Sequence, residues 1–392
     1  VARSRMRHSV TTTALLGASL PGRRAAAEMI AAAGGAPPDR LPTDDYFAEY
    51  AQLYDHIGML QDTERMDAYY NAIKYNAAVH FKGKTVLDVG SGTGVLAIWA
   101  AMAGARRVYA VEASSIGTHI ETLVESHGLS DVVTVVRDRM EKVDLPEQVD
   151  VIVSEWMGYF LLRESMVESV LLARDRWLRP GGVMYPSHAR LLVAPSVLPR
   201  FLERQRAEIA DAMAGWDHLA AEMRGQYGLN FHVLRPAYER EHHGYAFSQG
   251  WQGLLPAGLL RAPPKILLEV DMHAVTHAEL FGWETTVTFD LPIKPPAEPL
   301  HGICGWFDVR FCGSDENPAD ECVELDTSPE APPTHWAQTT LLLERPLSSP
   351  ALSIRLDQRG DSHHDLNVTL SSGDWSSSYA VTAEFRGLDL QE

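Results

Sequence analysis

The stretch TVLDVGSGTG, which runs from Thr85 to Gly94, decides the fold of this chain. Its first half is an apolar strand pattern, its second half has glycine at every other position, and an apolar helical pattern runs on from Val95 to Ala103. A strand, a glycine turn and a helix in this order form the nucleotide-binding half of a Rossmann-like unit. Glycine at these positions permits positive φ angles and lets a ligand approach the backbone closely.

Beyond this unit, strand patterns alternate with helical ones. The predicted strands are Arg107–Val111, Val132–Val136, Val149–Ser154 and Gly182–Tyr185. A long helix is predicted from about Tyr159 to Trp177. This alternation predicts a parallel sheet with helices on both faces, in which ligands lie at the carboxyl ends of the strands. The residues that come after those ends, and are expected to meet there, are Asp88–Gly94, Glu112, Met140, Glu141 and Ser154–Glu164.

One acid, Asp88, indicates which cofactor the glycine turn binds, since a turn of this kind alone serves a dinucleotide as well as S-adenosylmethionine. Asp88, at the end of its strand, can receive a cationic amine but would repel a pyrophosphate. Glu112 ends the next strand and can accept hydrogen bonds from both ribose hydroxyls. The pattern therefore favours S-adenosylmethionine, which carries an ammonium and a sulfonium group but no phosphate.

The segment SEWMGYFLLRE, from Ser154 to Glu164, carries a second pair of acids. Glu155 and Glu164 bracket apolar and aromatic residues, where an unpaired carboxylate is unfavourable and either neutralises or finds a cation. A planar guanidinium suits two carboxylates, because its N–H donors can engage both at once. The alternative is that Glu155 ends a strand in solvent and Glu164 lies on an exposed helix face.

Composition limits the class of partner. The 392 residues suffice for two or three domains, and 52 acidic against 34 basic side chains give a formal net charge of -18. This charge favours a basic polypeptide partner and disfavours direct nucleic-acid binding. No apolar run approaches the roughly 18 residues that span a membrane. The three cysteines (Cys304, Cys312 and Cys322) argue against a disulfide framework or a zinc site and favour a reducing compartment, and no metal is expected.

The expected organisation has three parts. Residues 1–42 are rich in arginine and poor in acids, which is typical of a transit peptide or of a disordered tail. Residues 43–186 hold two helical stretches before the Rossmann-like part, one from Asp44 with an apolar face that is typical of a core and includes Leu53 and Tyr54, and one from Gln61 to Phe81. Residues 187–392 are expected to form a β-barrel-like domain with a helical arm inserted at 198–250. Seven short β-type runs after Pro263 fit a barrel or a sandwich: Ile266–Val270, Glu284–Phe289, Gly305–Phe311, Gln338–Leu343, Leu352–Leu356, Asp365–Leu370 and Tyr379–Phe385.

From about Tyr46 to Phe385 the chain resembles the protein arginine methyltransferase family, through YFAEY, VLDVGSGTG, VEA, SEWMGYFLLRES and THW in this order. The resemblance implies that the YFAEY helix folds over the cofactor and that Arg65 pairs with the cofactor's carboxylate. It implies that Glu155 and Glu164 grip the substrate guanidinium and that His335, with its acidic partner Asp62, closes the site. The cofactor-binding residues it implies are Tyr46, Met59, Arg65, Asp88, Gly90, Gly92, Glu112, Ala113, Met140 and Glu141, and the substrate-binding ones are Tyr50, Met166 and Trp336.

Within the family, the segment ARDRWLRPGGVMYPSHAR (173–190) and the long 198–250 stretch resemble the plant-type branch. Met59 and Met166 stand where enzymes that make asymmetric dimethylarginine carry methionines, so the resemblance implies monomethyl and asymmetric dimethyl products, known as type I. It also implies a homodimer, histone or Arg-Gly-rich substrates, and a cytoplasmic or nuclear location. One departure is Ala113, where many relatives carry a cysteine after Glu112.

The residues also suggest how the reaction would proceed. Methyl transfer from a sulfonium is an in-line displacement, in which orientation alone can contribute roughly 7 to 11 kcal/mol at most. Glu155 and Glu164 could bias the charge of the guanidinium toward one side, and either a carboxylate or the Asp62–His335 pair could receive the proton. Two alternatives remain, a small-molecule methyltransferase and an inactive scaffold. The scaffold would lack one of Glu155, Glu164 or Arg65, and the small-molecule enzyme would not need the carboxyl-terminal β domain.

Overall fold

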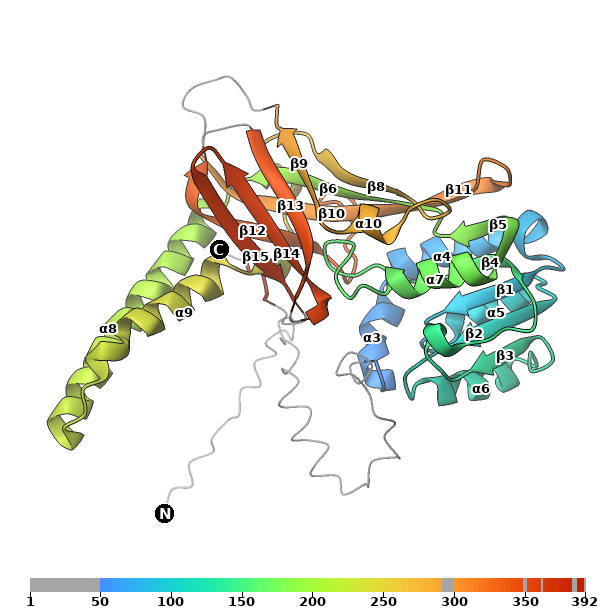
Figure 1. Cartoon of the computed structure of the whole chain (residues 1–392), viewed down its shortest axis with the longest axis horizontal. Helices are drawn as coiled ribbons and strands as arrows, with labels where there is room; N and C mark the ends of the chain where they lie inside the picture. Colours follow the sequence, from blue (N-terminus) through green and yellow to red (C-terminus); the bar gives the residue numbers. More distant parts are fainter. Residues whose placement is uncertain (1–49, 291–298, 348–350, 361, 383–385, 391–392) are drawn as a thin grey trace, which may run out of the picture. The chain divides into compact units, whose positions relative to one another are not determined.

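Strand β1 (Thr85–Val89) lies at the centre of a five-stranded parallel sheet with the order β3-β2-β1-β4-β5 (Figure 1). Its partners are β2 (Arg107–Val111) and β4 (Val149–Val153), with β3 (Val133–Val136) and β5 (Leu178–Tyr185) at the edges. All of β1 is buried, because helices cover both faces of such a sheet. The right-handed crossover rule places α5 (Val95–Met102) and α6 (Gly117–Ser126) on one face and α7 (Val167–Trp177) on the other. The predicted Rossmann-like sheet is confirmed.

The computed structural model describes residues 50–290, 299–347, 351–360, 362–382 and 386–390. These residues belong to the unit that runs from Asp44 to Glu392. The predictions for residues 1–42, for the start of the first helix and for Tyr46 therefore lie outside the described part of the chain.

The glycine turn needs glycine for two separate reasons. Gly90, Gly92 and Gly94 have φ angles of 70°, 55° and 87°, which side chains of L-residues rarely adopt. A Cβ on Gly90 would lie 2.1 Å from the Met166 side chain, and one on Gly94 would lie 2.6 Å from Ile120. The side chains of Met166 and Ile120 therefore pack closely against the turn.

The predicted helix from Tyr159 to Trp177 was wrong in its first half, because α7 begins only at Val167. Phe160, Leu161, Glu164 and Ser165 all have positive φ, which excludes an α-helix there. The segment instead forms a tight loop closed by a bridge between Gly158 and Leu161. A Cβ on Gly158 would lie 1.7 Å from the carbonyl oxygen of Arg163. Glu164 therefore sits on a loop and not on a helix face.

Before the sheet, the chain forms α3 (Leu53–Gln61), α4 (Thr63–Tyr75) and a π-helical turn, η1 (Ala77–Phe81). The helical stretch predicted from Gln61 to Phe81 is confirmed as α4 and η1, which Asn76 separates. Asp62 ends α3 and caps α4 by accepting a hydrogen bond from the Arg65 amide. The expectation that Leu53 and Tyr54 pack in a core was wrong for the single chain, because they are 46% and 62% exposed.

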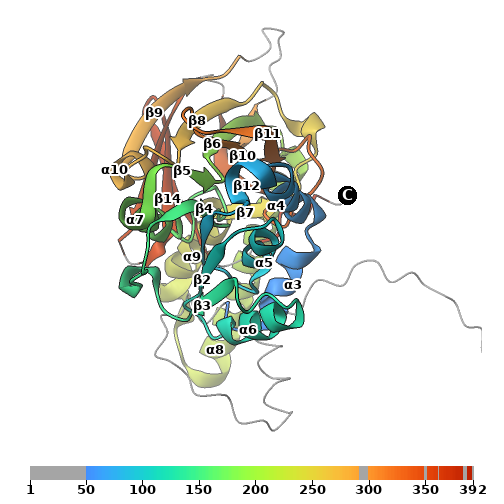
Figure 2. The same ribbon diagram turned by 90° about the vertical axis from the view of Figure 1, so that its right-hand side faces the viewer.

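The carboxyl-terminal half is a β-sandwich of two antiparallel sheets (Figure 2). The six-stranded sheet contains β6 (His188–Ser196), β7 (Gly250–Gly253), β8 (Lys265–Asp271), β10 (Leu300–Gly313), β11 (Pro318–Asp326) and β12 (Gln338–Leu347). The four-stranded sheet contains β9 (Trp283–Thr288), β13 (Ala351–Arg359), β14 (Ser362–Ser372) and β15 (Trp375–Val381). Short helices in this half include η4 (Ala257–Leu259) and α10 (His277–Leu280), and another, η2 (Met140–Lys142), lies between β3 and β4. Each of the predicted β runs overlaps one of these strands, whereas β6, β7 and β11 were not predicted.

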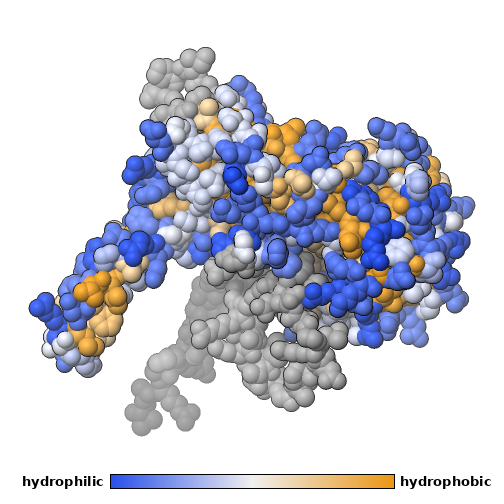
Figure 3. Space-filling view, viewed as in Figure 1, coloured by the Kyte–Doolittle hydropathy of each residue, from blue (hydrophilic) through white to orange (hydrophobic). Residues whose placement is uncertain are grey.

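A helical segment lies between β6 and β7. It consists of α8 (Pro199–Tyr227), η3 (Phe231–Leu234) and α9 (Arg235–Phe247), and the two long helices run side by side (Figure 1). At its base, Phe201, Phe247 and Trp251 form a core cluster that joins the segment to the six-stranded sheet. Farther along, apolar side chains are exposed on the surface (Figure 3): Leu219, Tyr227, Leu229, Val233 and Leu234.

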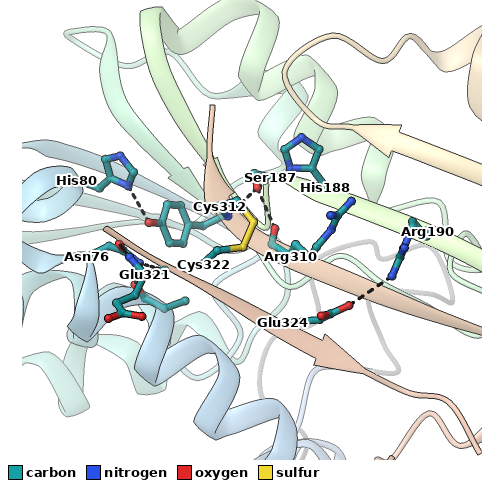
Figure 4. The surroundings of a disulfide bond; sticks show 12 residues. Asn76, His80, Ser187, His188, Arg190, Arg310, Cys312, Glu321, Cys322 and Glu324 are labelled. Carbon is teal, nitrogen blue, oxygen red and sulfur yellow. Dashed lines mark hydrogen bonds and ion pairs between the residues drawn. A yellow bond between two sulfur atoms is a disulfide. The ribbon is translucent and has the colours of Figure 1, made fainter. Parts of the chain in front are cut away.

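Cys312 and Cys322 form a disulfide between β10 and β11, so the argument against disulfide bonding was wrong for this pair (Figure 4). An odd cysteine count does not prevent one pair from forming. The two strands are antiparallel neighbours with a register shift between Phe311 and Gly313, and the Cα atoms of the cysteines lie 4.3 Å apart. Cys304 is free and buried, and burial raises the pKa of its thiol to about 12.

Candidate active site

Glu155 lies two residues after the end of β4, at the carboxyl end of the sheet, and its side chain is 11% exposed. Its Oε2 accepts hydrogen bonds from Nε and Nη2 of Arg65, at 3.2 and 3.0 Å. Its Oε1 is buried and has no hydrogen-bond partner among the described residues. Buried carboxylate oxygens are rarely left without a donor, so Oε1 has room to accept one more hydrogen bond.

Glu164 comes nine residues later on the loop, with a side-chain exposure of 15% and a φ of 89°. Its Oε1 accepts a hydrogen bond from Nη1 of Arg163 at 2.8 Å, and its Oε2 accepts one from the hydroxyl of Tyr50 at 2.6 Å. Neither glutamate lies in open solvent, so the solvent-exposed alternative for this pair was wrong. Tyr50, predicted to contact substrate, is thereby placed at the second carboxylate.

Arg65 connects the first glutamate to α3. Besides Glu155, its Nη1 donates to the carbonyl oxygen of Met59 at 3.1 Å. Its backbone amide donates to Asp62 at 3.0 Å. A cofactor carboxylate beside Arg65 would therefore lie next to Glu155. Arg65 thus links the predicted site of the methyl donor to the predicted site of the arginine that accepts the methyl group.

Asp62 and His335 form a close pair, as the resemblance implied. Oδ2 of Asp62 lies 2.7 Å from Nδ1 of His335 and accepts the His335 amide at 2.8 Å. Burial raises the pKa of Asp62, but hydrogen bonds from His335 and from the Arg65 amide outweigh burial and hold the pKa below its usual value. Because the carboxylate can only accept, Nδ1 of His335 carries the proton.

Trp336 does not face an open slot. It is 4% exposed, and its indole N–H donates to the carbonyl oxygen of Met157 at 2.9 Å. Tyr69 holds the same loop through a 2.9 Å hydrogen bond from its hydroxyl to the carbonyl oxygen of Ser154. These two buried side chains fix the backbone on which Glu155 stands.

Two of the three acids predicted to bind the cofactor, Asp88 and Glu112, accept hydrogen bonds from the glycine turn or from the helix that follows it. Glu112 accepts the Gly92 amide at 2.8 Å through Oε2 and the Ser114 amide at 2.7 Å through Oε1. Asp88 is fully buried and accepts the Ala97 amide at 3.0 Å. Burial raises the pKa of Asp88 to about 7, partly offset by its hydrogen bonds. Asp88 thus braces the first turn of α5, and Glu112 retains lone pairs at the edge of the turn.

One residue of this region was missed from the sequence. His56 on α3 is buried, its ring lies 3.2 Å from the position of a Cβ on Gly92, and its Nε2 lies 3.1 Å from the carbonyl oxygen of Tyr50. It is a single histidine in a run of aromatic and apolar residues before Met59, so neither spacing nor charge distinguishes it from a core residue.

The remaining predicted residues differ in exposure. Met140 is buried, Ala113 is half-buried, and Glu141 is exposed with its Oε1 accepting the Ser169 hydroxyl at 2.7 Å. Met166 covers Gly90 of the glycine turn.

A parallel sheet of this strand order, a glycine turn with positive φ and a carboxylate at the end of β2 fit the cofactor-binding part of a Rossmann-like enzyme, a class that includes the S-adenosylmethionine-dependent methyltransferases. A methyltransferase domain model matches residues 86–182, and a model of the arginine methyltransferase oligomerization subdomain matches residues 206–372.

Relatives identify the family. Protein arginine N-methyltransferase PRMT10 of Oryza sativa subsp. japonica is 46% identical over 334 residues, which are 84% of this chain and 87% of that protein. The crystal structure of Arabidopsis thaliana protein arginine methyltransferase 10, described as uniquely open, matches with a TM-score of 0.79 and 39% identity over 86% of this chain and 99% of that chain. The Trypanosoma brucei PRMT1 enzyme-prozyme complex with AdoHcy matches with a TM-score of 0.70 and 29% identity over 85% and 99%. The chain belongs to the protein arginine N-methyltransferase family, and it is an S-adenosylmethionine-dependent enzyme of that family.

Proposed function

We propose that Glu155 and Glu164 together hold the guanidinium of a substrate arginine and that the enzyme makes monomethyl and asymmetric dimethylarginine. The observation that carries this proposal is the buried Oε1 of Glu155, which lacks a donor among the described residues while Oε2 of the same side chain is engaged twice by Arg65. A guanidinium supplies the planar N–H donors that such a position requires.

The protein residues then divide the work of the reaction. Bound S-adenosylmethionine supplies an electrophilic methyl group. Glu155 and Glu164 orient the acceptor nitrogen and stabilise positive charge on the far side of the guanidinium. Arg65 holds Glu155 in place through two hydrogen bonds and fits the role of cofactor-carboxylate partner. His56 and Met166 cover the glycine turn and keep water away from the bound methyl donor.

For the proton, we propose the Asp62–His335 pair as the relay. Arg65 connects this pair to Glu155, since its amide binds Asp62 and its side chain binds Glu155. Asp62 fixes the tautomer of His335, so that Nε2 is the nitrogen left to accept a proton. A carboxylate of the glutamate pair remains the alternative acceptor.

Charge supports a basic substrate. The formal net charge of -18 attracts Arg-Gly-rich segments and histone tails and disfavours direct binding of nucleic acid. We place the enzyme in the cytoplasm, the nucleus or both. Among the described residues, no helix has the length and apolar character that crossing a membrane requires.

We further propose that the enzyme is a homodimer in which the arm of residues 198–250, containing α8 and α9, contacts the cofactor part of a second copy. Exposed apolar side chains at the far part of the arm are one half of the contact. The other half is a set of exposed apolar side chains on α3, α4 and α5: Leu53, Tyr54, Ile57, Tyr70 and Met102. In this organisation residues 43–186 bind the cofactor, residues 187–392 form the substrate domain, and residues 1–42 are a tail or a targeting peptide.

The test is mass spectrometry of a panel of arginine peptides after incubation with S-adenosylmethionine. We expect monomethylarginine first and asymmetric dimethylarginine later, most rapidly on Arg-Gly-rich and histone-tail peptides. Symmetric dimethylarginine, or an end product that stays monomethylated, would contradict the type I assignment.

A further inference from the structure

Three consecutive residues of β14, in the carboxyl-terminal sandwich, contact the loop that carries Glu164. The Glu164 amide donates to the His364 carbonyl oxygen at 2.7 Å, and Nδ1 of His364 donates to the Glu164 carbonyl oxygen at 2.6 Å. The Ser165 hydroxyl donates to the His363 carbonyl oxygen at 2.5 Å. The backbone on both sides of Glu164 is thus bonded to a strand that lies about 200 residues later in the sequence.

Asp365, the third of these β14 residues, acts through its side chain, which faces Arg163. The Arg163 side chain is 6% exposed and lies between two carboxylates. Its Nη1 donates to Oε1 of Glu164 at 2.8 Å, and its Nε lies 3.6 Å from Oδ1 of Asp365. A buried guanidinium is stable only when its charge is balanced, and here one carboxylate comes from the loop and the other from β14.

The loop requires support from outside itself. Phe160, Leu161, Glu164 and Ser165 have positive φ, a conformation that costs free energy for residues other than glycine and persists only where surrounding contacts enforce it. The contacts from β14 act at Glu164 and Ser165, two of these four positions.

We propose that Arg163, His364 and Asp365 form a clamp that sets the direction of the Glu164 carboxylate, so that the carboxyl-terminal sandwich takes part in catalysis as well as in substrate binding. These three are positioning residues, because they act through Glu164. The inference rests on the proposed role of Glu164 as one of the two groups that hold the substrate guanidinium.

The clamp makes a specific kinetic prediction. A carboxylate displaced by about 1 Å from a reacting group can slow turnover by up to about 100-fold, since catalysis depends on alignment. The clamp acts on the Glu164 loop and not on the glycine turn, so loosening it lowers kcat and leaves cofactor affinity unchanged.

The experiment compares Arg163→Lys, Arg163→Met and Asp365→Asn in the full chain. We would measure kcat and KM for an Arg-Gly-rich peptide, and the Kd of S-adenosylhomocysteine by calorimetry. Arg163→Met should lose the most kcat, about 100-fold. Arg163→Lys should lose about tenfold, because one ammonium can reach one carboxylate but not both. Asp365→Asn should fall between wild type and Arg163→Met, and Kd should be unchanged in all three.

A matched control lies on the neighbouring strand of the same sheet. Arg355 and Asp357 on β13 also form an ion pair, which is more exposed than that of Arg163, with Nε and Oδ2 2.7 Å apart. The guanidinium of Arg355 donates to Asp357 and not to the Glu164 loop. Arg355→Met and Asp357→Asn should therefore keep wild-type kcat.

The outcomes separate the clamp from the role of Glu164. If Glu164→Gln keeps wild-type kcat, the proposed role of Glu164 is wrong and the clamp with it. If Glu164→Gln is inactive while Asp365→Asn and Arg163→Lys turn over at the wild-type rate, only the clamp is overturned. Equal kcat for Arg163→Lys and Arg163→Met would also overturn it, because that result indicates packing and not charge. Arg163→Lys and Asp365→Asn decide between these outcomes if Arg163→Met does not fold.

Discussion

At the scale of single residues, the site depends on carboxylates that are buried to different degrees and partnered differently. Glu155 is held by a guanidinium, Glu164 by a guanidinium and a phenol, and Asp62 by an imidazole and two backbone amides. Asp88 differs, since its charge is opposed by burial and supported chiefly by hydrogen bonds within the turn. These differences make each acid respond separately to substitution and to pH.

Asp88 predicts a pH dependence of stability. Burial raises its pKa from 3.8 to about 7, so between these values the folded chain keeps a proton that the unfolded chain has lost. Its contribution to the free energy of unfolding is therefore present below pH 3.8 and is lost as the pH rises through about 7. The free energy of unfolding of the wild type should therefore fall as the pH rises through this range, and Asp88→Asn should reduce the slope of that fall. Urea unfolding from about pH 4 to about pH 8 measures this slope. A slope equal to that of the wild type would contradict this assignment.

Met59 predicts the degree of methylation. Its carbonyl oxygen positions Arg65, and its half-buried side chain lies on α3 beside the site. Met59→Phe should narrow the acceptor slot and shift the product toward monomethylarginine by about tenfold, since a misfit of one or a few atoms in a pocket is worth roughly 1–3 kcal/mol. Mass spectrometry of the peptide product measures the ratio. An undiminished yield of dimethylarginine would show that Met59 does not line the acceptor slot.

At the scale of elements, the sequence predicts the segments with regular patterns and misses those that depend on distant contacts. Strands β1 and β2 were found with their observed bounds, because buried parallel strands are continuous apolar runs. Strand β11 was missed because its residues are mostly exposed and polar. The helix predicted from Tyr159 failed because apolar spacing cannot reveal the positive φ angles that β14 supports.

The candidate site divides in the same way. The glutamate pair could be predicted from its local motif, whereas the roles of Arg65 and of the Asp62–His335 pair, whose residues are 273 positions apart, were implied only by the family resemblance. His56 was missed as a single histidine among aromatic residues, and the Arg163–Asp365 contact joins residues that are too far apart in the sequence for any spacing rule to connect. Tertiary packing decides which contacts cross between the cofactor part and the sandwich.

The docking of the β10–β11 hairpin on α4 gives a prediction at this scale. The buried side chain of Asn76, just past α4, donates to the Glu321 carbonyl oxygen at 2.8 Å and accepts the Glu321 amide at 3.0 Å (Figure 4). Asn76→Ala leaves both backbone groups without these partners and should lower the free energy of unfolding by about 1–3 kcal/mol. Urea unfolding measures this, with the exposed Lys74→Ala as a control that should behave like wild type. Equal stability of the two variants would show that the hairpin does not depend on Asn76.

At the scale of the whole molecule, the arm predicts the oligomeric state. Its exposed apolar residues form an unfavourable surface on a single chain, and contact with a second copy would bury that surface. Replacing residues 198–250 with a short linker should give monomers in sedimentation equilibrium, with methylation activity well below that of the full chain. A dimer that survives the deletion would refute the arm as the contact.

The reaction as proposed requires two carboxylates to hold one guanidinium opposite a methyl donor. The most direct test is Glu155→Gln, measured by transfer of labelled methyl groups to an Arg-Gly-rich peptide together with S-adenosylhomocysteine affinity. The amide oxygen of glutamine can keep a bond to Arg65, so affinity for S-adenosylhomocysteine should stay near the wild-type value. Transfer should fall by about 100-fold or more, because the negative charge is gone. Transfer at the wild-type rate, or loss of cofactor binding together with transfer, would contradict this arrangement.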